Sequence, residues 1–235
     1  MVKQAIRDLL ILQAEDLRIR DLKTRLMSIP RERAALVAEF DVVRKGLEKA
    51  KQNKLKVEQA VKQQAAATKA AQEKLQALKI KSSSIKKINE YNAILAEIEA
   101  AKKNISDSET REIELMDEQE AADKLLAKAE RSYKATGRTV QAEVRELDSL
   151  KDAIAKEIAE KEIRSAELAK NVVPNYLGPY RRMLAAGKGS PVGTIRNGSC
   201  SNCNMKNSPQ TTMEARNGNL VNCDNCSFYL YDPDA

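Results

Sequence analysis

Histidine and tryptophan are absent from this chain of 235 residues, and Phe occurs only twice. A compact core of this size normally contains more aromatic bulk, so the scarcity favours an elongated shape. Without histidine the chain lacks the side chain that most often serves as a general acid or base. It also lacks the glycine-rich loops that bind phosphates, of the GxxxxGK[ST] or GxGxxG type. These absences predict a protein that is not an enzyme and has no small-molecule substrate.

Long hydrophobic runs are missing as well. The longest run of Leu, Ile and Val alone is residues 9–12, whereas a membrane-spanning helix needs roughly 20 apolar residues. The opening residues, MVKQAIRDLL, are interrupted by Lys3, Arg7 and Asp8, which is not the pattern of a signal peptide. We therefore expect a cytoplasmic protein with no membrane insertion, in a compartment where thiols stay reduced.

Proline and glycine are scarce before residue 170, where only Pro30, Gly46 and Gly137 occur. Both residue types disfavour helix interiors, so their scarcity permits long helices. This part is also dominated by Ala, Glu, Lys, Leu and Arg, the composition of a coiled coil. We expect Pro30 to kink or break the first helix without changing its apolar frame, and Gly137 to make the second helix irregular.

An apolar heptad repeat runs along the first half of the chain. When residues 36–78 are sampled from Leu36 in alternating steps of four and three, ten of the 13 sampled positions are apolar. The same frame extends back through residues 12–29. Such a persistent seam is typical of a coiled coil. A second pattern with three/four spacing runs through residues 94–158 and becomes less regular toward its end. The patterns predict two long helices.

The serine run at residues 82–84 separates these two patterns, and serine favours turns and helix ends. Residues 44–87 hold 13 Lys or Arg and three Glu, a net charge of +10. Residues 88–130 hold five Lys or Arg and 12 Asp or Glu, a net charge of −7. An antiparallel hairpin places these segments against each other, whereas a parallel dimer would juxtapose like charges. We therefore predict an antiparallel coiled-coil hairpin over residues 1–170, with its turn near residues 81–90.

The four cysteines form two pairs, Cys200 with Cys203 and Cys223 with Cys226, in the spacing C-x2-C-x19-C-x2-C. This spacing is typical of zinc sites, in which thiolates surround the ion tetrahedrally. Four protein ligands leave no open coordination position, so we expect one structural Zn²⁺. Two disulfides in a secreted protein are the competing interpretation, which the absence of an export signal disfavours. Redox sensing by the thiolates is a further alternative.

The sequence around the cysteines predicts a small β-structure. Asn217-Gly218 is a strong signal for a two-residue hairpin, and SFYLYD at residues 227–232 favours a closing strand. We therefore predict a C4 zinc ribbon over residues 197–235 that depends on its metal for folding. Residues 171–196 are expected to connect it to the hairpin, with a short helix at residues 180–186 that Gly187 ends, and a strand from Val192.

The arrangement resembles a bacterial family of C4-type zinc-ribbon proteins with a long N-terminal antiparallel helical hairpin. Besides the cysteines, the resemblance includes INEYNAILAEI at residues 88–98 and VPNYLGPYRRML at residues 173–184, in which Pro174, Tyr180 and Leu184 match the family pattern. It covers essentially the whole chain. The resemblance implies a non-enzymatic adaptor. It also implies partners such as the nitrogen-type alternative sigma factor, flagellar or type III secretion components, and RNA.

Three hypotheses for function follow. A protein-binding adaptor would use free helical faces and the aromatics Phe228 and Tyr229, although these rings are also suited to closing the core of the ribbon. A nucleic-acid-binding protein would use basic side chains near the ribbon to contact phosphates. Those side chains are Arg181, Arg182, Lys188, Arg196, Lys206 and Arg216. A pure spacer would depend only on the length and stiffness of the hairpin.

Overall fold

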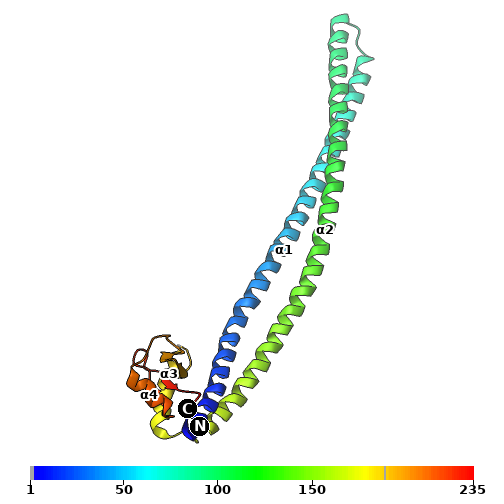
Figure 1. Ribbon diagram of the computed structural model, residues 1–235. Coiled ribbons are helices and arrows are strands. Elements are labelled where there is room, and N and C mark those ends of the chain that lie inside the picture. The colour runs from blue at the N-terminus through cyan, green and yellow to red at the C-terminus, as the bar shows by residue number, and fades with distance from the viewer. Residues whose placement is uncertain (1–2, 188) are drawn as a thin grey trace. The chain divides into compact units, whose positions relative to one another are not determined.

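The structure, a computed structural model, describes residues 3–187 and 189–235 (Figure 1). Two long helices pack together and precede a small region that contains the strands, which confirms the predicted fold class. In chain order the elements are α1 (Gln4–Ser82), α2 (Ile88–Ala169), α3 (Pro174–Ala185), β1 (Val192–Arg196), β2 (Ser199–Cys200), α4 (Pro209–Arg216), β3 (Val221–Asn222) and β4 (Tyr229–Tyr231).

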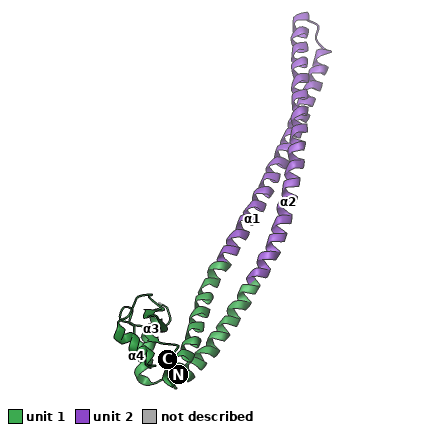
Figure 2. Cartoon of the chain, viewed as in Figure 1, with its two compact units in different colours: residues 1–33, 145–235 green, residues 34–144 purple. Residues whose placement is uncertain are grey.

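The chain divides into two compact units (Figure 2). We call residues 34–144 the hairpin unit, because it consists of α1 and α2 segments and the turn that joins them. Residues 1–33 and 145–235 form the ribbon unit, which contains the remaining parts of α1 and α2 together with all later elements.

In the hairpin unit α1 and α2 run antiparallel, and one row of mainly apolar side chains lies between them. The Phe40 and Tyr133 rings pack with their centroids 5.0 Å apart. Among the residues that the structure describes, Lys54 and Asp123 form this unit's one ion pair between the helices, at 2.7 Å. The opposed charges predicted for these segments therefore meet directly at a single position. The buried side chains of the row are Leu47, Ala50, Thr68, Ile94, Ile98, Ala101, Ile105, Leu115 and Ala122.

The turn of the hairpin lies between Ser82 and Ile88. Ser82, Ser83 and Ser84 each donate their hydroxyl to the backbone carbonyl three residues earlier, at 2.7–2.8 Å. The last carbonyls of a helix have no partner within it, so these bonds stabilise the end of α1.

Neither long helix is broken at the positions where a disturbance was expected. The helix α1 continues through Pro30, because the adjacent Ile29 is buried in a cluster with α2 that offsets a proline penalty of about 3 kcal/mol. The helix α2 is likewise continuous through Gly137. A Cβ at Gly137 would lie 3.2 Å from Cε2 of Phe40, so this glycine makes room for the Phe40 ring.

In the ribbon unit, the α1 and α2 segments pack through Ile19, Leu22, Ile29, Ile154 and Ile158. Ion pairs border this cluster. They join Glu15 to Lys161 and Arg164, Arg18 to Glu157, Lys23 to Glu162, and Arg33 to Asp148.

The helix α3 begins at Pro174, well before the short helix expected from residue 180. Gly178 and Pro179, which lie inside this helix, disfavour a helix that begins before residue 180. Pro174 nevertheless suits the first turn, because the backbone N–H groups of a first turn have no partner within the helix and proline lacks this group. Gly187 follows the helix with a φ of +69°, in agreement with its predicted role as terminator.

The sheet has the strand order β2-β1-β4-β3. β1 is antiparallel to β2 and parallel to β4, and β3 is antiparallel to β4. The strand from Val192 is therefore part of the sheet, and we call residues 192–231 the ribbon. Its inner core consists of Ile195, Cys200, Ala215, Val221, Cys223 and Leu230.

The hairpin predicted at Asn217-Gly218 is wrong, because the helix α4 precedes this pair. Ser208 caps α4 by accepting a hydrogen bond from the backbone N–H of Thr211 at 3.2 Å, and Pro209 occupies the first turn. Gly218 then ends the helix with a φ of +76°, and its N–H donates to the carbonyl of Ala215 at 2.9 Å. An Asn-Gly pair suits a helix end as well as a hairpin, because both need a left-handed residue.

Candidate metal centre

Cys200 and Cys203 lie on a tight turn at the end of β2. The backbone N–H of Cys200 donates to the carbonyl of Met205 at 3.0 Å, and its carbonyl accepts from the N–H of Asn204 at 2.9 Å. The chain can reverse this sharply because Asn204 has a φ of 59°, in the left-handed region that Asn tolerates better than most residues.

Cys223 and Cys226 lie on a second turn with the same pattern of bonds. The N–H of Cys223 donates to the carbonyl of Phe228 at 2.8 Å, and its carbonyl accepts from the N–H of Ser227 at 3.0 Å. Ser227, with a φ of 62°, takes the place that Asn204 has in the first turn. The two C-x2-C pairs are therefore built alike, and each presents two thiols to the same point.

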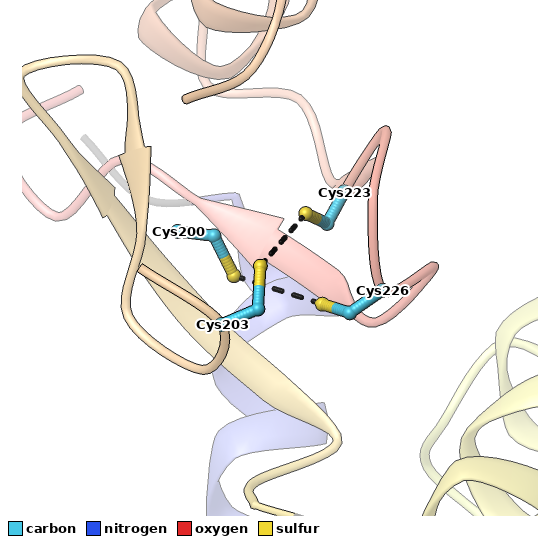
Figure 3. A group of neighbouring side chains, drawn as sticks. All are labelled: Cys200, Cys203, Cys223 and Cys226. Carbon is cyan, nitrogen blue, oxygen red and sulfur yellow. Dashed lines mark hydrogen bonds between the residues drawn. The ribbon is translucent and has the colours of Figure 1, made fainter. Parts of the chain in front are cut away.

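The four sulfur atoms converge from these two turns (Figure 3). The Sγ atoms of Cys200 and Cys226 are 3.8 Å apart, as are those of Cys203 and Cys223, and all four lie within 4.8 Å of one another. A disulfide requires about 2.05 Å between sulfurs. A tetrahedral ion with zinc–sulfur bonds of about 2.3 Å places its ligands about 3.8 Å apart. The four cysteines therefore fit one tetrahedral metal ion.

The thiols of this cluster differ in how readily they ionise. Burial raises the pKa of Cys200 and raises that of Cys226 to about 12. Burial also opposes ionisation of Cys223, but hydrogen bonds from the backbone N–H groups of Cys226 and Asn225 outweigh it and lower the pKa to about 7. Four thiolates this close together repel one another unless a cation compensates them, so metal binding must release protons.

The remaining predicted binding residues do not gather into one surface. Arg196 and Arg216 line one hollow of about 640 Å³, but Asp232 and Asp234 line it too. Arg181 lines a separate groove beside Tyr180. Arg182 lies near Tyr229 and Lys206 is exposed, and neither of them lines these two hollows. Lys188 lies outside the described residues.

The two aromatic candidates also have structural roles. The Tyr229 side chain is only 6% exposed and meets Tyr176 edge-to-face, with ring centroids 5.9 Å apart. It is thus part of the apolar core and not of a binding surface. Phe228 is half-buried beside the second cysteine turn.

Gln13, which the sequence patterns do not single out, attaches the ribbon to α1. Its side-chain amide donates to the carbonyl of Val192 at 2.9 Å and accepts from the N–H of Val192 at 2.5 Å. Gln13 is only 8% exposed, so these bonds are made away from water. Because β2 pairs only with Ile195 and Arg196 of β1, the Gln13 side chain supplies at Val192 the kind of hydrogen bonds that a neighbouring strand would make. Its sequence signal is weak, because the partner is a backbone group far along the chain.

Asp16, one turn further along α1, fastens two more elements. It accepts hydrogen bonds from the Tyr180 hydroxyl of α3 at 2.7 Å and from the Ser165 hydroxyl of α2 at 2.5 Å. Tyr180 is fully buried, and this burial, together with Asp16, raises the pKa of the Tyr180 phenol well above its ordinary value. An apolar cluster that includes Leu9, Leu12, Val192 and Tyr229 surrounds these bonds.

None of the helices in the described parts of the chain combines the length and the apolar character that a membrane crossing requires.

The chain matches no protein-family model and no curated protein, but it is similar to several solved structures. CT398 from Chlamydia trachomatis superposes with a TM-score of 0.80 at 25% identity, over 97% of each chain. A Mycobacterium smegmatis protein has a TM-score of 0.64 at 16% identity, over 99% of this chain and 100% of its own. The HP0958 protein from Helicobacter pylori has a TM-score of 0.56 at 19% identity, over 100% of both chains. The chain thus shares its fold, over nearly its whole length, with proteins from three bacteria.

Proposed function

We propose that this protein is a non-enzymatic adaptor in which a zinc ion organises the ribbon and the helices bind a protein partner. The observation that carries the proposal is the exposure of large apolar side chains on the hairpin unit, where Val42 is 70% and Ile113 and Met116 are each 63% exposed. Two helices alone cannot cover such side chains, and an amphipathic helix from a partner can.

The proposed metal is Zn²⁺ in a structural role. A set of four sulfur ligands at tetrahedral spacing suits zinc or an iron–sulfur centre, and a zinc site of this kind has no open position for a substrate. Elemental analysis of freshly purified protein should find about one zinc per chain. Iron with visible absorption, or bridged cystines without metal, would contradict this assignment.

The partner class follows from the sequence resemblance: the nitrogen-type alternative sigma factor, or components of flagella or type III secretion. The test is cross-linking of the full chain inside its own cells, followed by mass spectrometry of what it retains. A Cys223→Ser variant examined in parallel separates partners that need the folded ribbon from partners that bind the helices. A wild-type chain that retains no protein specifically would refute the adaptor function.

Nucleic-acid binding through the ribbon receives less support. Its best basic pair, Arg196 and Arg216, shares a hollow with Asp232 and Asp234, whose charges repel phosphate. If RNA is nevertheless bound through phosphate contacts, its affinity must fall steeply as salt is added. Tight, salt-sensitive RNA binding that Arg196→Ala and Arg216→Ala weaken would favour this alternative over the adaptor.

A further inference from the structure

The hairpin unit contains an apolar groove of about 680 Å³ between α1 and α2. Residues 43–56 of α1 form one wall, and residues 125–132 of α2 form the other. Leu47 and Ala50 lie at its base and are buried, whereas Leu125 on the rim is 52% exposed. The groove therefore offers apolar surface that the chain itself leaves uncovered.

Gly46 lies on the wall of this groove, and the packing of the chain does not explain it. A Cβ at Gly137, the other glycine inside the long helices, would meet the Phe40 ring. A Cβ at Gly46 would meet nothing within 4 Å. Glycine inside a helix costs about 1 kcal/mol relative to alanine. The fold would therefore be more stable with a side chain at this position, and the open space is consistent with close approach of another molecule to the α1 backbone.

The rim of the groove carries charge of one sign. Lys49, Lys56 and Lys128 line it, and its lining includes no acidic residue. All three lysines are exposed, and within the described ranges none of them forms an ion pair. An apolar floor with a basic rim is complementary to an apolar stripe flanked by carboxylates.

The dimensions of the groove suggest a helical occupant. At 1.5 Å per residue, the wall formed by residues 43–56 is about 20 Å long. This length matches about four turns of a helix, whose anchors recur at three- and four-residue spacing.

Building on the proposed adaptor function, we propose that this groove binds one amphipathic helix of a partner protein, with an apolar stripe flanked by Asp and Glu. The Gly46 position lets the partner helix approach the α1 backbone, and Lys49, Lys56 and Lys128 contact its carboxylates.

The test uses the full zinc-containing chain and a fluorescent 16-residue helical peptide with leucines at three/four spacing and glutamates beside them. A matched peptide carries lysines in place of the glutamates. We expect the acidic peptide to bind and the basic peptide to bind at least about tenfold more weakly, a difference that added salt reduces. Equal binding of the two peptides would overturn the proposal.

The groove is then blocked with Gly46→Leu. We expect this variant to bind the acidic peptide at least about tenfold more weakly while its melting temperature stays the same or rises, since the new Cβ meets nothing within 4 Å and the groove beside it is open. Gly178→Leu is the matched control, because Gly178 is also a helical glycine with nothing within 4 Å but lies in α3. Unchanged peptide binding in Gly46→Leu would overturn the proposal.

Charge reversal tests the rim without filling the groove. Lys49→Glu with Lys56→Glu should weaken acidic-peptide binding, whereas Lys69→Glu, an exposed position of α1 outside the groove, should not. If these variants weaken peptide binding equally, the acidic peptide is attracted by the overall positive charge of α1 and not by the groove, which would contradict the proposal.

Two further experiments identify what binds in the groove and distinguish a failure of the groove proposal from a failure of the adaptor proposal. Sedimentation that shows self-association of the wild type, lost in Gly46→Leu, would assign the groove to a second copy of this chain and overturn the partner assignment. In cells, a Gly46→Leu chain that keeps every cross-linked partner would refute the groove and leave the adaptor intact. A wild-type chain without partners would refute the adaptor itself.

Discussion

The ribbon and the hairpin unit obtain their stability in different ways. Two of the six residues in the inner core of the ribbon, Cys200 and Cys223, belong to the cysteine cluster, so the core and the candidate metal site overlap. The hairpin unit instead repeats small contacts along two helices, each of which involves few side chains. The ribbon should therefore be lost as a whole when one ligand fails, whereas the hairpin should respond to single changes by small amounts.

The largest effect is expected from Cys223→Ser. Structural zinc sites supply about 10–16 kcal/mol of binding free energy that is also folding free energy. The variant should lose the proposed zinc and the near-ultraviolet circular dichroism of Tyr229 in β4 and of Tyr176, whose ring packs against it. The far-ultraviolet helix signal of α1 and α2 should persist.

Met205→Ser is the control for this variant, since it changes an exposed side chain next to the first cysteine pair. It should keep its zinc. A Cys223→Ser chain that retains the near-ultraviolet signal would show that the ribbon folds without a metal ion. The ribbon and the hairpin unit would then not differ in how they are stabilised.

The next largest effect is expected from Gln13→Ala. The substitution leaves the N–H and the carbonyl of Val192 buried without their partner, at about 1–3 kcal/mol for each unsatisfied group. Denaturant unfolding of the zinc-bound chain should show this loss in the transition that the tyrosine signals report. Gln63→Ala, at an exposed position of α1, should be neutral. Equal stabilities of the two variants would mean that Gln13 does not hold the ribbon.

The features that could be predicted from the sequence are those that depend on residues close together in the chain. The heptad repeat predicts the paired helices because burial between two helices requires that period. The C-x2-C pairs predict the sulfur cluster because each pair needs only one tight turn. Gln13 escaped prediction because its partner is the backbone of Val192, which only the tertiary fold brings near. The helix α4 was missed because Asn217-Gly218 fits two structures, and the choice depends on the Ser208 cap at the other end of the segment.

A smaller effect, dependent on pH, is expected from Tyr180→Phe. Loss of the hydrogen bond to Asp16 should cost about 1.5–3 kcal/mol at neutral pH. The folded-state pKa of Tyr180 is raised above the ordinary value near 10, so its contribution is complete below about pH 10 and is lost as the unfolded chain ionises above it. The difference in unfolding free energy between wild type and variant should therefore shrink above about pH 10. A constant difference from pH 8 to pH 11 would contradict burial of the phenol.

The smallest effects distinguish the two glycines inside the long helices. Gly46→Ala should stabilise the chain by up to about 1 kcal/mol, because alanine is the better helix former and the new methyl group meets open space. Gly137→Ala should gain nothing or destabilise, because its methyl group would lie 3.2 Å from the Phe40 ring and would force that ring or the helix to move. Thermal unfolding of the zinc-bound variants, followed by the helix signal, measures both. If Gly137→Ala stabilises as much as Gly46→Ala, the Phe40 ring moves aside at no cost and packing does not explain Gly137. If neither substitution stabilises, the penalty for a helical glycine does not apply to these helices, and the absence of a packing reason for Gly46 no longer points to an occupant of the groove.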